Sequence, residues 1–172
     1  MADRFPGWEL SHRFDPAAVR IADRHYSRVS PGTPQFVAPG RNVVLVSPGR
    51  DAVWVSLWQR YAKHKWAGAW VCSMFRNESG YLSSEMIRAA VAATRWVWGD
   101  PPPEGMVTFV DAEKVRPKRH PGYCFRCAGF VEVGRTKDDG YVVLQLVPED
   151  MPEPAAPLGA QLSFLTAGIG GQ

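Results

Sequence analysis

The sequence predicts a single mixed α/β (α+β) domain with a mostly antiparallel central sheet flanked by helices. Two observations carry this prediction: the order of β-rich and helix-period segments along the chain, and the tight Pro/Gly turns between neighbouring strands. The 172 residues suffice for one domain with a substantial core, and 45% are hydrophobic against 22% charged. We expect this domain to span residues 1–147. Residues 148–172 form a Pro-, Ala- and Gly-rich tail that we expect to be extended or partly disordered.

The predicted order of elements is βα, a β meander, α, β, α and a closing β hairpin. Asp15 followed by Pro16 predicts a helix start, because Asp is a favoured N-cap and Pro a favoured first helical residue. The runs "NVVLVS" and "AVWVSLWQR" are joined by "PGRD", which predicts a hairpin. The expected strands are 7–14, 42–47, 52–60, 69–75, 106–111, 131–136 and 141–147, with a short extended piece at 35–37. The expected helices are 15–26, a long one capped by Ser83 or Ser84 and ending near Trp98, and 121–130.

Composition limits the class of protein. No apolar run approaches the ~20 residues that span a bilayer, and the N-terminus lacks a signal-peptide core, so we expect a cytoplasmic protein without a membrane partner. Three cysteines, an odd number, argue against a secreted disulfide framework. Cys124-x-x-Cys127 has no second such pair, and we interpret it as helix packing. The formal charge of +3 is too small to identify a polyanionic partner.

The stretch "FRNESGYLSSEMIRAA" (75–90) passes from a strand end through a polar turn into the longest expected helix. Free backbone N–H groups at a helix start bind anions, and the hydroxyls of Ser83 and Ser84 add donors. Arg76 is placed to neutralise phosphate charge, and Gly80 is the single glycine of the turn. Alternatively the serines only cap the helix, and both interpretations can hold together.

Three further side chains suggest chemistry. Asp111 ends a buried strand, where it is either a turn residue or a functional carboxylate at the sheet edge. His25 and Tyr26 end a helix before a Pro-rich loop, where the histidine either interacts with the helix dipole or belongs to a site. A histidine near an aspartate supplies a general base, and a His/Tyr/Asp set can equally hold a metal.

Two basic segments predict contacts with DNA phosphates, with a solvated loop as the alternative. Trp66 accompanies the first segment, and tryptophans are suited to stack on an extruded base. The basic residues are Arg60, Lys63 and Lys65 in the first segment and Lys114, Arg116, Lys118 and Arg119 in the second.

Three pieces of the chain carry a resemblance. They are "RHYSRVSPG" with His25 and Tyr26, "SSEMIRAA" with Ser84, Glu85 and Arg88, and "VTFVD" followed by "KRHPGYCFRCAGFVEVGRT" with Asp111, His120, Gly122, Tyr123 and Gly134. Together, over roughly residues 15–147, they resemble the Mom-like phage DNA-modification proteins, a divergent branch of the GNAT superfamily of N-acetyltransferases. The closing "YCFRCAGFVEVGRT" is similar to the GNAT C-terminal signature, in which a short helix ends in Gly-Phe before a hairpin.

The resemblance implies a cytoplasmic, phage-derived enzyme that modifies the N6 amine of adenine in DNA and protects phage DNA from restriction. It implies a carbamoylmethyl-type product, acetyl-CoA as the acyl donor, and iron. The GNAT pyrophosphate loop carries a second small residue after its glycine, and the single Gly80 departs from it, which suggests unusual donor chemistry. The alternatives are a conventional GNAT N-acetyltransferase for a small amine or protein, and a non-catalytic DNA-binding relative; a homodimer is also left open.

The resemblance also implies roles for individual residues. Tyr123 is expected near the CoA sulfur as a general acid, unless it only packs on its helix. The implied catalytic residues are His25, Tyr26, Asp111 and Tyr123, and the first three of these are the implied iron ligands. The implied cofactor-binding residues are Arg76, Gly80, Ser83, Ser84 and Arg88.

Overall fold

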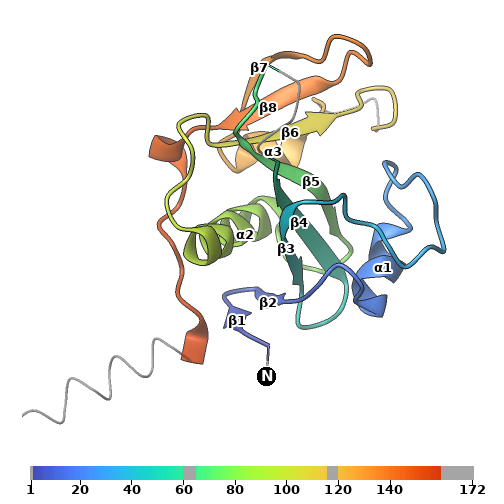
Figure 1. The fold of residues 1–172 in the computed structure, drawn as a ribbon, viewed down its shortest axis with the longest axis vertical. Helices are drawn as coiled ribbons and strands as arrows, with labels where there is room; N and C mark the ends of the chain where they lie inside the picture. Colours follow the sequence, from blue (N-terminus) through green and yellow to red (C-terminus); the bar gives the residue numbers. More distant parts are fainter. Residues whose placement is uncertain (1, 60–64, 116–119, 160–172) are drawn as a thin grey trace, which may run out of the picture.

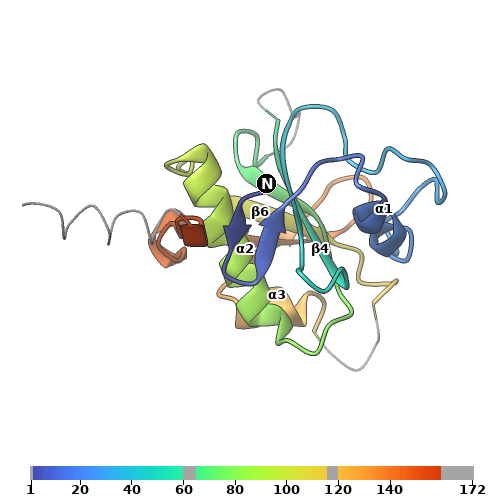
Figure 2. The same cartoon turned by 90° about the horizontal axis from the view of Figure 1, so that it is seen from below.

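The computed structural model describes residues 2–59, 65–115 and 120–159 (Figures 1 and 2). It confirms the predicted class, because the described residues form one eight-stranded, mostly antiparallel sheet with three α-helices. The strands are β1 (Arg4–Phe5), β2 (Trp8–Leu10), β3 (Arg41–Val46), β4 (Ala52–Trp58), β5 (Trp70–Asn77), β6 (Met106–Val110), β7 (Val131–Arg135) and β8 (Val142–Leu146). The helices are α1 (Pro16–Ala22), α2 (Ser83–Trp98), α3 (Tyr123–Cys127) and a short 3-10 helix, η1 (Pro148–Asp150).

The helices cover both faces of the sheet. Figure 2 shows α2 and α3 on one side and α1 on the other. The alternation along β3 and β4 explains this: Leu45 and Trp54 pack with the core under α2 and α3, whereas Val44 and Val53 pack with α1. Both faces of the central strands are therefore buried, so these strands read as continuous apolar runs.

The strand order is β1-β2-β3-β4-β5-β6-β8-β7. All neighbours are antiparallel except β5 and β6, which are parallel because the chain crosses between them through α2. The expected hairpins β3–β4 and β7–β8 are both present. In the first, the turn after Ser47 places Arg50 in the left-handed region at φ 58°, which suits a tight hairpin turn.

The parallel pair β5–β6 ends after three residue pairs. Trp70, Val71 and Cys72 of β5 lie opposite Met106, Val107 and Thr108 of β6. Beyond these pairs β5 continues along β4, and β6 continues along β8. The two strands therefore diverge in the middle of the sheet (Figure 1). In the described chain, the facing edges of β5 after Cys72 and of β6 after Thr108 form no ladder with each other.

Several expected elements differ in the structure. The expected strand 7–14 is shorter in the structure, where only β2 (Trp8–Leu10) forms within it. The additional strand β1 precedes it, and Gly7 at φ 77° turns the chain between the two. Residues 35–37 form no strand; Val37 is instead buried against the α1 side.

The helix α1 begins as expected but ends early. Asp15 is its N-cap and accepts a hydrogen bond from Ala17 N–H, and Pro16 is the first helical residue. The helix ends at Ala22 rather than at residue 26, because the Asp23 carboxylate binds Arg28 and the Gly32 N–H and turns the chain.

The start and end of α2 also correct the expectation. Neither serine is the N-cap: Ser83 is the first helical residue, the N-cap is Leu82, and the Ser83 hydroxyl accepts a hydrogen bond from Asn77 instead. Ile87, Ala90 and Val91 of α2 are buried, but Val97 is exposed. Trp98 takes its place, packing against Trp58 and Trp70.

The first part of the expected tail packs on the domain. Met151 is 6% exposed and belongs to the core under α2. The Arg95 guanidinium donates to the Pro152 carbonyl at 2.8 Å, and Ala155 N–H donates to Ala92 O at 3.2 Å. Residues 148–155 therefore continue the packed structure along α2.

This packing predicts that replacing Met151 destabilises the protein. The substitution Met151→Ala should lower the free energy of unfolding by about 2–4 kcal/mol, because it leaves a cavity in the core. The matched control Leu158→Ala changes an exposed tail side chain and should alter it by less than about 0.5 kcal/mol. Urea denaturation measures both, and equal effects of the two substitutions would contradict the observed packing.

Candidate functional site

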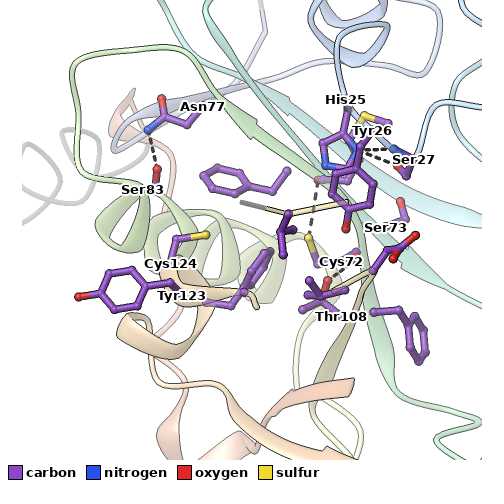
Figure 3. Close-up of a pocket in the computed structure, with 18 of the residues that line it drawn as sticks. His25, Tyr26, Ser27, Cys72, Ser73, Asn77, Ser83, Thr108, Tyr123 and Cys124 are labelled. Carbon is purple, nitrogen blue, oxygen red and sulfur yellow. Dashed lines mark hydrogen bonds between the residues drawn. The ribbon is translucent and has the colours of Figure 1, made fainter. Parts of the chain in front are cut away.

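A cavity of about 1110 Å³ opens where β5 and β6 diverge. It is lined by the loop after α1, the outer half of β5, the turn before α2, the end of β6 and the start of α3 (Figure 3). The structure therefore brings together segments that lie far apart in the sequence. The expected site residues that line this cavity are His25, Tyr26, Gly80, Ser83, Ser84, Asp111, Lys114 and Tyr123.

His25 is held as a neutral ring with both nitrogens engaged. Its Nδ1 accepts hydrogen bonds from the Ser27 N–H at 3.2 Å and lies 2.7 Å from the Ser27 hydroxyl. The other nitrogen, Nε2, must then carry the proton, and the backbone of Phe75 forms a hydrogen bond with the ring. Burial, together with the nearby Arg76 cation, lowers the pKa of His25 to about 4.

Tyr26 lies beside His25 and reaches the end of β6. The two rings stack with their centroids 4.5 Å apart. Burial raises the pKa of the Tyr26 phenol, while a hydrogen bond with the Asp111 backbone acts in the opposite direction. Figure 3 shows the His25–Tyr26 pair above the floor of the cavity formed by Cys72 and Thr108.

The stacked pair bridges the divergence. His25 is bonded to the Phe75 backbone in β5, and Tyr26 to the backbone of Asp111, directly after β6. Beyond the Cys72–Thr108 pair, β5 and β6 no longer pair with each other, and His25 and Tyr26 from the loop after α1 connect the two strands there. This arrangement suits a residue that positions its neighbours, and the low pKa of His25 makes it a weak proton acceptor.

Asp111 keeps one carboxylate oxygen available to the cavity. Its Oδ1 accepts from the Glu113 N–H at 3.0 Å, whereas its Oδ2 has a long, 3.8 Å contact with the Lys114 ammonium. The side chain is 15% exposed. Asp111 is therefore a turn residue through one oxygen and a candidate proton acceptor through the other.

A β-bulge at Ser73 was not anticipated from the sequence. Val55 and Ser56 of β4 lie opposite Met74 and Cys72, so Ser73 is an extra residue in β5. The Thr108 hydroxyl donates to the Cys72 carbonyl at 3.0 Å, which fixes β5 just before the bulge. Bulges redirect side chains next to functional sites, and Ser73 is exposed in the cavity wall.

The turn before α2 is organised by Asn77. Its Nδ2 donates to Tyr81 O at 2.8 Å and to Ser83 Oγ at 3.0 Å, and its Oδ1 accepts from Ser79 N–H at 2.9 Å. No side chain caps α2, so the first-turn N–H groups have no side-chain acceptor from the N-cap, and Ser83 and Ser84 of this turn line the cavity. A methyl group added at Gly80 would meet open space, so this glycine is not required by close packing.

Two expected cofactor residues do not line the cavity. Arg76 bonds Glu78 at 2.8 Å, and Arg24 bonds the same carboxylate, which holds the pKa of Glu78 at about 2. Arg88 donates to the Ala128 carbonyl at 2.8 Å and so ties α2 to the end of α3. Arg88 therefore joins two helices, whereas Arg76 is paired with a carboxylate at the end of its own strand, and Arg24 links that carboxylate to the segment after α1.

The start of α3 positions Tyr123. Gly122 precedes it at φ 69°, and an added Cβ would lie 2.3 Å from Leu144 Cδ1, so a side chain is excluded here. Tyr123 is 50% exposed, and Figure 3 shows its hydroxyl directed away from Tyr26. Cys124 and Cys127, free thiols on the same helix, also line the cavity.

The expected DNA-contacting residues are only partly placed. Lys114 lines the cavity, and Lys65 lies over the ring of Trp66 at 5.7 Å. Trp66 is 8% exposed, so it packs in the core, and no tryptophan is among the described lining residues. Arg60, Lys63, Arg116, Lys118 and Arg119 lie outside the described residues.

The residues expected to hold iron do not fit a metal in this arrangement. A histidine ligand needs a free lone pair, and the Nδ1 lone pair of His25 already accepts from Ser27. Within residues 2–59, 65–115 and 120–159 there is also no group of three or more His, Cys, Asp or Glu side chains suited to a metal. We therefore derive no step through iron.

Comparisons with known proteins do not assign this chain to a family. No match to a protein-family model, a curated protein or a solved structure was found for this chain. In the described part of the chain, no helix combines the length and apolar character needed to cross a membrane.

The low pKa of His25 predicts a pH-dependent stability. An unfolded histidine takes up a proton near pH 6.5, but the folded one does so only near pH 4, so stability falls as the pH is lowered from about 6.5 to about 4. His25→Phe keeps a ring against Tyr26 but removes this titration. Urea unfolding at pH 7 and pH 4.5 should show a smaller loss for the variant than for the wild type. An identical loss in both proteins would show that His25 is not held neutral.

Proposed function

We propose that the chain is a transferase that moves a group from an acyl-CoA-type donor to the exocyclic amine of a base in DNA. The resemblance to Mom-like proteins implies adenine N6 as the acceptor amine and a carbamoylmethyl-type product. The observation that carries the proposal is the cavity at the divergence of β5 and β6, which gathers His25, Tyr26 and Asp111 opposite the start of α2.

The donor side of the cavity fits a long, polyamide cofactor with a diphosphate. Residues 73–77 of β5 lie beyond the last β5–β6 pair, so within the described chain their β6-facing edge offers backbone donors and acceptors to an extended amide arm. The uncapped N–H groups of Ser83, Ser84 and Glu85 suit the diphosphate. Glu85 places a carboxylate in the same turn, which opposes a phosphate and agrees with a donor site unlike the usual CoA loop.

The acceptor side offers a base for the amine. When bound, a thioester donor would supply an acyl carbon, with the CoA thiol as leaving group. This step gives an N-acyl amine, and the carboxamide nitrogen of a carbamoylmethyl-type product would require a second, amine or ammonia, donor. Forming a new N–C bond at an exocyclic amine releases a proton from nitrogen, and Asp111 Oδ2 is the described lining atom suited to accept it. The Tyr26 phenol, through its bond with the Asp111 backbone, fixes the position of this carboxylate.

Nucleoside mass spectrometry tests the proposed function. DNA from bacterial cells expressing the wild-type chain should contain a modified nucleoside, and Asp111→Asn should lower its yield about 100-fold or more, because a positioned base contributes about 10²–10⁴ in rate. Asp139→Asn, in the exposed β7–β8 turn, is the matched control and should leave the yield unchanged.

Two outcomes would contradict the proposal. Unmodified DNA together with newly acetylated small amines or proteins would identify a conventional N-acetyltransferase. Unmodified DNA, unmodified amines and retained DNA binding would identify a non-catalytic relative.

A further inference from the structure

Exposed apolar side chains are concentrated at the cavity. Of the eleven large hydrophobic side chains that are exposed in the described chain, five line it. These five are Tyr26, Val29, Tyr81, Leu82 and Tyr123. Exposed apolar groups gathered around a concave surface mark a binding site rather than ordinary surface.

Tyr81 is the most exposed aromatic residue of this set, at 76%. Its backbone is nevertheless fixed on both sides: its carbonyl accepts from Asn77 Nδ2 at 2.8 Å, and its N–H donates to Ser79 Oγ at 3.2 Å. Ser79 is itself held by Asn77 Oδ1. A large ring with few rotatable bonds on a fixed backbone loses little conformational entropy when it binds a ligand.

The surroundings of Tyr81 favour a neutral, planar ligand. Its neighbours Gly80 and Leu82 are uncharged, and the nearby Glu78 carboxylate is neutralised by Arg24 and Arg76. Stacking on a nucleobase requires such a flat π surface and no particular hydrogen-bond pattern. No tryptophan is among the described lining residues, and of the tyrosines and phenylalanines that line the cavity Tyr81 is the most exposed.

We propose that Tyr81 is the stacking platform for a nucleobase at the mouth of the cavity. The chemistry is that of a neutral heteroaromatic ring, which has two sources: a base extruded from DNA, and the adenine of a CoA-type donor. The first source rests on the proposed function. The second requires only that the cavity bind a nucleotide-containing donor.

Binding measurements on Tyr81→Ala and Tyr81→Phe test the proposal. The nucleic-acid probes are a single-stranded oligonucleotide with one 2-aminopurine and the same strand with an abasic site. The donor probes are CoA and phosphopantetheine, which lacks the adenine. Trp96→Ala is the matched control, because Trp96 is exposed at 44% and does not line the cavity. Circular dichroism of each variant verifies that it is folded.

Tyr81→Ala should bind one of the two base-containing probes about 5- to 100-fold more weakly, as expected for one lost stacking contact, whereas Tyr81→Phe and Trp96→Ala should bind like the wild type. A loss for the 2-aminopurine strand but not for the abasic strand identifies a DNA base. A loss for CoA but not for phosphopantetheine identifies the donor adenine.

Other outcomes overturn the inference. If Tyr81→Ala binds every probe as the wild type does, or loses base-containing and base-lacking probes equally, Tyr81 is not a stacking platform. A wild-type protein that binds neither base-containing probe overturns it as well. A wild-type protein that binds CoA but no oligonucleotide contradicts the proposed function, and the CoA comparison then decides the role of Tyr81 by itself.

Discussion

The early end of the β5–β6 pairing is the constraint on which the rest of the structure depends. Two parallel strands bond for three residue pairs and then follow different antiparallel partners. Their separation leaves backbone groups outside the ladder in the middle of a sheet, where such groups require partners. The His25–Tyr26 pair supplies partners for the backbone of Phe75 and Asp111. The other backbone groups at the divergence face the cavity. The site is therefore a direct consequence of the sheet topology.

This constraint changes how the site residues are interpreted. The ring of His25 is neutral and contacts both Ser27 and the backbone of Phe75, which suits a residue that holds the loop after α1 against β5 rather than a base or a metal ligand. Asp111 remains the candidate for proton transfer, because one of its oxygens has only a long contact with Lys114. The bulge at Ser73 and the Asn77 network complete the opposite wall. In the proposed function, positioning and proton transfer therefore fall to different side chains of one cluster.

Much of the fold and many of the residues that line the cavity could be predicted from the sequence, but the contacts that hold these residues could not. The Asp15–Pro16 helix start and the β3–β4 turn are determined by a few adjacent residues, and both are present. The Ser73 bulge depends on pairing with β4 and leaves no trace in an apolar strand. Ser83 resembles a helix cap in sequence, but its hydroxyl instead accepts a hydrogen bond from the Asn77 side chain, six residues earlier. The partner of Arg88, the Ala128 carbonyl, lies 40 residues away in the sequence and depends on tertiary contacts in the same way.

Hydrogen–deuterium exchange with and without a non-reactive CoA analogue tests the central claim most directly. The claim is that the divergence of β5 and β6 forms the donor site. Bound analogue should slow the exchange of backbone amides in residues 73–77 and 83–85, because these groups become hydrogen-bonded to the ligand. Amides of the β7–β8 turn should exchange at unchanged rates. Protection confined to other segments, or no protection at saturating analogue, would contradict the account.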